Sequence, residues 1–95
     1  MLNIDTKVVV NGFGDSEYPD NPTYQKITTL ENSLQVIQEH LRTQTEYPVN
    51  GFIFSVNLFE DASFIYSYLN GKTRISGKYS DDETVYGLVQ EYIRS

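Results

Sequence analysis

The dipeptide Asn70-Gly71 constrains the fold of this chain more than any other short segment. A two-residue type I′ hairpin turn needs positive φ at both central residues, and Asn-Gly adopts that conformation readily. Apolar and polar residues alternate on both sides of it, so we expect an antiparallel hairpin of strands 64–69 and 72–78. Leu69 would then lie opposite Lys72. One face of the hairpin would be apolar, formed by Phe64, Tyr66, Tyr68 and Ile75.

A second alternating segment covers residues 52–58 and precedes this hairpin. Its apolar residues reach the same sheet face only if the connection to residue 64 has an odd length, because a shift of one residue moves every side chain to the opposite face. A three-residue loop at Glu60-Asp61-Ala62 fulfils this requirement and predicts that Leu58 lies opposite Phe64. The opposite, free face of the sheet would carry a mixed set of residues: Ile53, Ser55, Asn57, Ile65, Ser67, Leu69, Lys72 and Arg74.

The N-terminal part of the chain contains a β-branched run followed by a segment rich in turn-forming residues. Residues 7–11 contain three consecutive valines and precede Gly12, which is typical of a strand that ends at a glycine. Residues 14–26 hold two of the three prolines, together with Asp, Asn and Ser, so we expect a long loop there. Loops of more than about 12 residues are often functional, which makes this one a candidate contact surface.

Two segments have the periodicity of an amphipathic helix. In residues 29–43, apolar side chains recur three or four positions apart, and Thr28 with Glu31 has the spacing of a capping box. In residues 81–94, Ser80 and Glu83 have the same spacing, and the acidic residues at the start suit the positive end of the helix dipole. We therefore expect helix N-caps at Thr28 and Ser80.

These elements follow one another in the order β-α-β-β-β-α. We expect an α+β fold, a two-layer sandwich in which a four-stranded, mostly antiparallel sheet carries both helices on one face. The 95 residues suffice for a single domain, 1–95, because domains most often contain about 100–150 residues. The last strand would lie at one edge of the sheet.

The composition excludes several classes of function. Thirteen acidic and seven basic residues give a net charge of −6, which would repel phosphate backbones, so direct nucleic-acid binding is not expected. The chain contains no cysteine and therefore no disulfide, thiol nucleophile or Cys-ligated zinc site, which is typical of a cytoplasmic protein. No stretch approaches the ~20 apolar residues of a membrane span, so we expect neither membrane insertion nor a signal peptide.

Candidate catalytic and metal-binding residues are few. His40 is the only histidine, and no orienting group accompanies it at a suitable helical spacing, so we do not expect an enzyme. Asp15, Glu17 and Asp20 lack the regular spacing and the central glycine of a calcium loop. We therefore expect no metal site and no cofactor.

Lys72, Arg74 and Lys78 fall on one face of the last predicted strand and form the only basic stripe in the chain. Charged residues on an edge strand commonly prevent edge-to-edge aggregation. A contact with an anion or with an acidic protein is the alternative interpretation, and the sequence leaves both open.

Aromatic residues are abundant, with eight tyrosines and five phenylalanines. Tyrosine is enriched at protein interfaces, and Tyr18 and Tyr24 lie in the predicted long loop beside acids and prolines. We therefore expect a small acidic non-enzymatic protein-binding module that inhibits or neutralises a partner with a basic surface, like an immunity protein, an antitoxin or a phage anti-defence protein. The predicted contact residues are Tyr18, Asp20, Tyr24, Glu60 and Asp61.

The alternative function is a small-molecule or nucleotide-sensing domain that uses the free sheet face or a cleft between two subunits. Its candidate ligand-binding residues are Ser67, Lys72 and Arg74. Either a monomer or a homodimer is compatible with the sequence. Thermal stabilisation by metabolites would separate this alternative from protein binding, because a ligand that binds only the folded state stabilises it.

Overall fold

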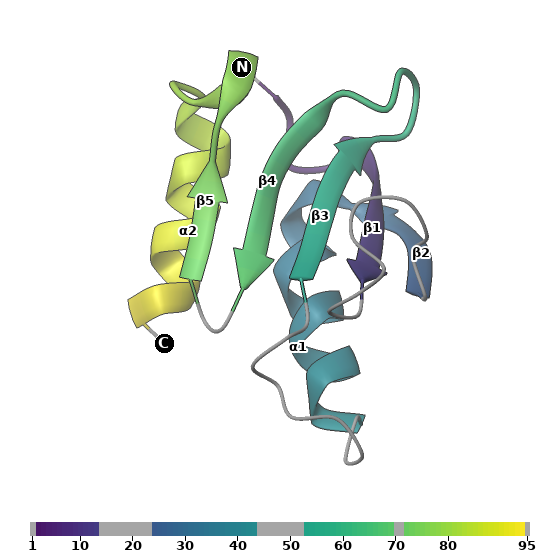
Figure 1. Ribbon diagram of the computed structural model, residues 1–95. Coiled ribbons are helices and arrows are strands. Elements are labelled where there is room, and N and C mark those ends of the chain that lie inside the picture. Colours follow the sequence, from purple (N-terminus) through teal and green to yellow (C-terminus); the bar gives the residue numbers. More distant parts are fainter. Residues whose placement is uncertain (1, 14–23, 44–52, 70–71, 95) are drawn as a thin grey trace.

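The computed structural model describes residues 2–13, 24–43, 53–69 and 72–94. Within these ranges the chain forms strands, two helices and two short 3-10 turns (Figure 1). In chain order they are β1 (Lys7–Phe13), β2 (Tyr24–Thr29), η1 (Leu30–Asn32), α1 (Ser33–Thr43), β3 (Ile53–Leu58), β4 (Phe64–Leu69), β5 (Lys72–Ile75), η3 (Gly77–Tyr79) and α2 (Glu83–Arg94).

The strands form one sheet in the order β2-β1-β3-β4-β5, and every neighbouring pair is antiparallel. Both helices lie behind this sheet in Figure 1, with α1 behind β1 and β3 and α2 behind β5. The expected α+β fold with an antiparallel sheet and two helices is confirmed. The expected number of strands is wrong, because the sheet has five strands and not four.

The additional strand is β2, which pairs along its whole length with β1. The prediction placed residues 24–26 in a loop and began a helix at residue 29, whereas residues 24–29 are extended. The sequence of β2 does not alternate clearly between apolar and polar residues, and Gln25, Lys26 and Ile27 are all exposed. Pairing with β1, whose Val8 and Val10 are fully buried, holds this polar segment in the sheet. The rest of the predicted loop, residues 14–23, lies outside the described residues.

The start of α1 differs from the predicted capping box. Thr28 belongs to β2, and the backbone amides of Leu30 and Glu31 donate to the carbonyl oxygens of Thr6 and Ile4, at 2.8 and 2.9 Å. Amides at the start of a helical segment have no partner within the helix. Here the carbonyl oxygens of N-terminal residues accept their hydrogen bonds, and no side-chain cap does so. The α-helix itself begins at Ser33, after the 3-10 turn.

The start of α2 is capped by Asp82 instead of Ser80. Oδ1 of Asp82 accepts hydrogen bonds from the amides of Thr84 and Val85, at 3.0 and 3.1 Å. Its other oxygen, Oδ2, accepts a hydrogen bond from the amide of Leu2 at 2.9 Å. One carboxylate thus caps the helix and attaches the N-terminal segment to it, which satisfies three backbone donors.

The core lies between the sheet and the two helices. Its polar component is a buried hydrogen bond of 2.6 Å between the hydroxyls of Tyr66 in β4 and Ser33 in α1. The hydroxyl of Ser33 also donates to the carbonyl oxygen of Leu30, at 2.7 Å. The apolar core residues are Val8, Val10, Leu30, Leu34, Val36, Ile37, Phe54, Val56, Ile65, Tyr66, Tyr68, Val85 and Val89.

A β-bulge changes the predicted register between β3 and β4. Val56 lies opposite Tyr66, but Asn57 lies opposite Phe64, so Ile65 is an extra residue on β4. Phe64 was expected opposite Leu58 on the helix-covered face and instead lies on the free face. Ile65 was expected on the free face and is instead fully buried in the core.

The register between β4 and β5 agrees with the prediction. Leu69 lies opposite Lys72 and Tyr66 opposite Ile75, while residues 70–71 lie outside the described residues. The strand β5 is shorter than expected, because it ends at Ile75 and Gly77 adopts a φ of +72°. Lys78 therefore lies in η3 and does not continue the stripe formed by Lys72 and Arg74.

Candidate functional site

A row of hydrogen-bonded amide side chains crosses the free face of the sheet. Nε2 of Gln25 in β2 donates to Oδ1 of Asn11 in β1, at 2.8 Å. Nδ2 of Asn11 then donates to Oδ1 of Asn57 in β3, at 3.2 Å, and this oxygen also accepts from the hydroxyl of Ser55, at 3.1 Å. Nδ2 of Asn57 donates to the carbonyl oxygen of Ala62, at 3.1 Å. Three strands and one turn are thereby held in a fixed relation.

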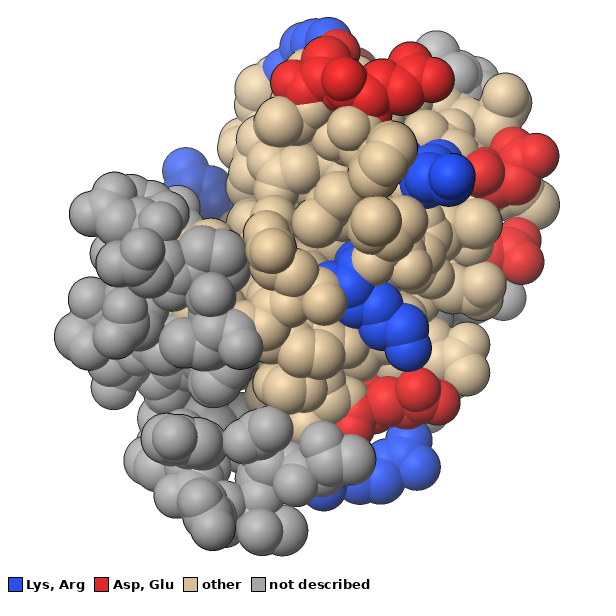
Figure 2. All heavy atoms as spheres, turned by 90° about the vertical axis from the view of Figure 1, so that its right-hand side faces the viewer, with Lys and Arg blue, Asp and Glu red and all other residues tan. Residues whose placement is uncertain are grey.

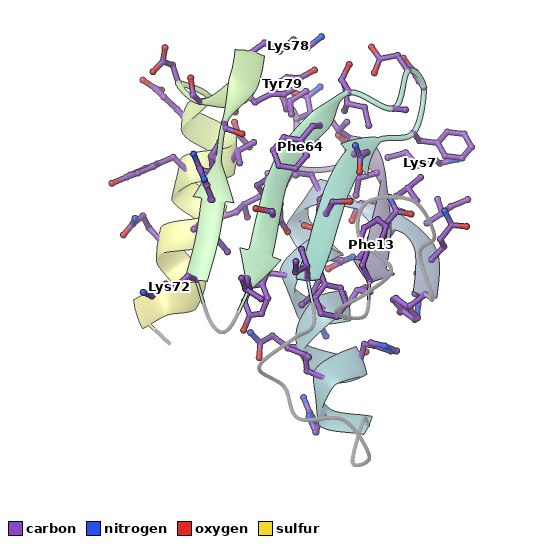
Figure 3. All side chains as sticks on the ribbon, in the orientation of Figure 1. Lys7, Phe13, Phe64, Lys72, Lys78 and Tyr79 are labelled. Atoms are coloured by element: carbon purple, nitrogen blue, oxygen red, sulfur yellow. The ribbon has the colours of Figure 1, made fainter. Side chains whose placement is uncertain are left out.

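The amide row forms the floor of an open hollow of about 500 Å³. Phe59 is 47% exposed, and Phe64 is half-buried. Figure 3 shows Phe64 on the side of β4 that faces away from the helices. The hollow therefore combines aromatic surface with polar groups of fixed orientation, as small binding sites do. Its lining residues are Val9, Asn11, Phe13, Gln25, Ser55, Asn57, Leu58, Phe59, Ala62 and Phe64.

The turn between β3 and β4 forms the rim of this hollow and exposes two acids, Glu60 and Asp61. Leu58 and Ser63 close the turn by a backbone hydrogen bond of 2.8 Å, and Ala62 adopts a φ of +60°. The amide of Ser63 donates to Oδ1 of Asp61 at 2.9 Å. This bond, with the hydroxyl of Ser63, lowers the pKa of Asp61.

The charges are distributed unevenly between the sheet and the rest of the chain. None of the five strands contains an Asp or a Glu, and the basic strand residues on the free face are Lys7, Lys72 and Arg74. The ammonium group of Lys7 lies 5.2 Å from the centroid of the Phe59 ring, which is a cation–π contact. On the side of the molecule shown in Figure 2, uncharged residues make up most of the described surface, and acidic and basic side chains lie next to each other in several places.

The structure brings together only part of the predicted protein-binding site. Tyr18 and Asp20 lie outside the described residues. Tyr24 is half-buried in β2 opposite Gly12, whereas the turn with Glu60 and Asp61 follows Leu58, which lies opposite Val8. These two positions are about 13 Å apart along β1, because a strand rises about 3.3 Å per residue. Glu60 and Asp61 adjoin the hollow, and Tyr24 lies on the opposite face of the sheet.

The predicted ligand-binding residues share the free face but do not line the hollow. Ser67 lies opposite Arg74, and Lys72 lies opposite Leu69. Both basic side chains are exposed on β5, which is an edge strand of the sheet, as predicted. The hollow lies over β1, β2 and β3, on the side of β4 that is away from β5.

The hollow brings together residues that lie far apart in the sequence. The alternating pattern predicts Ser55 and Asn57 on the free face, but it gives Asn11, Phe59 and Phe64 no role in a site. A polar Asn in each of two expected strands is a signal in the sequence, since polar amides in a sheet face are usually exposed or paired. The pairing of these strands was needed to show that the two amides meet.

His40 packs against two aromatic rings in the described part of the molecule. Its ring stacks on Tyr24, with centroids 3.9 Å apart, and meets the edge of Phe54 at 5.8 Å. The described residues contain no group of three or more His, Cys, Asp or Glu side chains that could hold a metal ion. Desolvation by burial lowers the pKa of His40 below its usual value, and the pKa of Tyr24 is raised, mainly by burial.

The shifted pKa of His40 predicts that acidification destabilises the fold. The unfolded chain takes up this proton at about pH 6.5, whereas the folded protein takes it up only at lower pH. The free energy of unfolding should therefore decrease as the pH falls below about 6.5. Urea titrations between pH 8 and pH 5 measure this slope. In His40→Phe, which keeps a ring against Tyr24 but does not titrate, this contribution to the slope should vanish; an unchanged slope would contradict the assignment.

Comparison with protein-family models, with curated proteins and with solved structures finds no match for this chain. Neither helix in the described residues has the length and apolar character needed to cross a membrane.

Proposed function

We propose that this protein is a non-enzymatic binding module that docks on a basic surface of a partner protein and thereby inhibits or neutralises it. Proteins of the immunity, antitoxin or phage anti-defence type act in this way. The observation that carries the proposal is the exposed Phe59 beside the hollow, next to the acidic tip of the same turn. We propose that the docking surface consists of this hollow and of Glu60 and Asp61.

The hollow and its rim suit a long basic side chain of the partner. An arginine or lysine has an apolar stem and a charged head. The stem would pack against Phe64 and beside the Phe59 ring, where it would take the place of the ammonium group of Lys7, and the head would lie next to the carboxylate of Asp61. A cation over an aromatic ring contributes about 0.5–1 kcal/mol at an exposed site, and more when water is excluded.

The turn is rigid enough to make such a contact without a large loss of conformational entropy. Four hydrogen bonds hold it: Leu58 to Ser63, Ala62 to Leu58, Ser63 to Asp61 and Asn57 to Ala62. A preformed loop loses little conformational freedom on binding, so more of the contact energy appears as affinity. The net charge of −6 would also accelerate the encounter with a basic partner.

The proposal is tested by charge reversal at the rim. A tagged protein is used to capture partners from a lysate of its source cells, and the double variant Glu60→Lys/Asp61→Lys is compared with Glu39→Lys/Asp81→Lys. Both variants change the net charge equally, and all four side chains are exposed. We expect one stoichiometric basic partner that is lost with the rim variant, retained with the control and weakened by salt.

Two results would contradict this function. One is a partner that both double variants lose equally, because net charge alone would then explain the binding. The other is the absence of any stoichiometric protein partner at low salt. A Phe59→Ala variant provides a second measurement at the same site, and we expect its affinity for the captured partner to fall by about tenfold or more.

A small-molecule ligand is a second candidate for the same hollow, because about 500 Å³ lies within the range of known ligand sites. The amide row would then orient the ligand through its remaining donors and acceptors. Thermal shift measurements with metabolite pools test this alternative. We expect a rise in melting temperature that Phe59→Ala and Asn11→Ala reduce, whereas no metabolite-induced shift would exclude it.

A further inference from the structure

The two edges of the sheet are protected differently. The β5 edge is only four residues long and carries the charged residues Lys72 and Arg74, which are common protections against strand pairing. The β2 edge is six residues long and has a single charge, Lys26. Its Ile27 is 54% exposed. Within the described residues, the β2 edge is therefore open to pairing with a further strand.

The backbone of β2 offers regularly spaced hydrogen-bonding groups along this edge. Antiparallel residues turn their N–H and C=O groups alternately toward one neighbour and the other. The amide of Leu30 donates to Thr6 on the β1 side, so Thr28 and Lys26 also turn toward β1. The backbone groups of Gln25, Ile27 and Thr29 consequently point outward. In the described part of the chain no strand lies beyond β2, as Figure 1 shows.

We infer that β2 is a dimerisation edge, at which two copies of this chain pair their β2 strands antiparallel about a two-fold axis at Ile27. In this register Ile27 lies opposite Ile27 of the second copy, and Gln25 lies opposite Thr29. All three outward-facing residues then exchange backbone hydrogen bonds with the second copy. The two five-stranded sheets join into one continuous sheet.

Side-chain chemistry selects this register among those that the symmetry allows. Opposite residues must share a face, so the nearest alternatives have the two-fold axis at Lys26 or at Thr28, and an axis at Lys26 would place two like charges opposite each other. Either alternative would also leave only two of the three outward-facing residues paired within β2, whereas the axis at Ile27 pairs all three. With the axis at Ile27, Lys26 lies opposite Thr28, and its long side chain can extend away from its symmetry mate.

The surrounding surface also favours a second copy of the chain. Figure 2 looks onto this side of the molecule, where uncharged residues make up most of the described surface and the acidic groups lie toward its borders. Pairing at Ile27 would cover two exposed isoleucines, which are close to each other on the free face. Because the axis is perpendicular to the sheet, both hollows would open on the same side of the dimer.

The absence of cysteine from the chain allows a direct test of the register. In Ile27→Cys, the two thiols would lie on Cα atoms about 5.5 Å apart, within the range of a disulfide. In the matched control Gln25→Cys, the symmetry mates would lie four residues apart, or about 13 Å. We expect Ile27→Cys to form a disulfide-linked dimer under mild oxidation and Gln25→Cys to stay largely uncrosslinked. Equal crosslinking of both variants would overturn the register.

Sedimentation equilibrium of the unmodified protein, from micromolar to millimolar concentration, tests the dimer itself. We expect a concentration-dependent dimer that Ile27→Lys weakens by at least tenfold, because two like charges would then be opposite each other. Ile4→Lys is the matched control, since Ile4 is 52% exposed but lies outside the sheet. A protein that remains monomeric throughout, or a dimer that both variants weaken equally, would overturn the inference. These outcomes are independent of the proposed docking surface, whose variants lie in the turn at residues 59–61.

Discussion

Replacement of Phe54 by alanine is expected to lower the free energy of unfolding by about 3–5 kcal/mol. Phe54 has no exposed surface and lies in β3, the central strand of the sheet. Its ring makes edge contacts with His40 of α1 and Tyr68 of β4, with centroids 5.8 and 6.3 Å away. Truncation would remove buried apolar surface and leave a cavity that these rigid neighbours cannot close. Small domains have a total stability of about 5–15 kcal/mol, so this variant would retain little of it.

The matched control is Phe59→Ala, which makes the same chemical change at a residue that is 47% exposed. Surface substitutions usually change stability by about 0.5 kcal/mol or less, and we expect somewhat more here because the contact with Lys7 is lost. Urea or guanidinium unfolding followed by far-ultraviolet circular dichroism measures both variants. If they were equally stable, the sheet–helix core described above would be incorrect.

The second large effect is expected for Asp82→Ala, which should lower the free energy of unfolding by about 1–2 kcal/mol. The change leaves the amides of Thr84 and Val85 without a cap and removes the carboxylate that accepts the hydrogen bond of Leu2. It therefore weakens both the start of α2 and the attachment of the N-terminal segment. The same unfolding measurement applies, and amide hydrogen exchange would show faster exchange in the first turn of α2.

Two further variants separate the two roles of Asp82. In Asp82→Asn, the side-chain oxygen can still cap α2, but the amide nitrogen cannot accept the hydrogen bond of Leu2, so an intermediate loss is expected. Ser80→Ala removes the cap that the sequence predicted and should change stability by less than about 0.5 kcal/mol. A larger loss in Ser80→Ala than in Asp82→Ala would show that the helix begins earlier than the structure indicates.

The strand pairing of the C-terminal half was largely predictable, and the exceptions have a local cause. Side-chain parity and the hairpin signal were sufficient to pair Leu69 with Lys72 and Tyr66 with Ile75. The alternation of side chains does not reveal a β-bulge, however. The extra residue keeps the predicted faces on one side of the bulge and exchanges the two faces on the other side. Phe64 and Ile65 were therefore assigned to the wrong faces, and Phe64 became part of the hollow on the free face.

The missed strand and the missed caps have a different cause, which is competition between local and distant partners. A capping box at Thr28 is locally favourable, but Thr6 and Ile4 offer carbonyl oxygens to the same amides. The sequence contains no sign of which partner is closer. Similarly, β2 has no apolar periodicity of its own, because its position in the sheet depends on the backbone of β1.

The sequence by itself determined the α+β class, the two amphipathic helices, the hairpin of β4 and β5 and the polar residues of β3 on the free face. These features follow from periodicities of two and of 3.6 residues, which are properties of neighbouring positions along the chain. Only the tertiary structure decided the fifth strand, the cap at Asp82 and the meeting of Asn11, Asn57 and Phe59 around one hollow. In each case a polar group meets a partner far along the chain, β1 for β2, Leu2 for Asp82 and Asn57 for Asn11, and that choice is made when the strands and helices pack together.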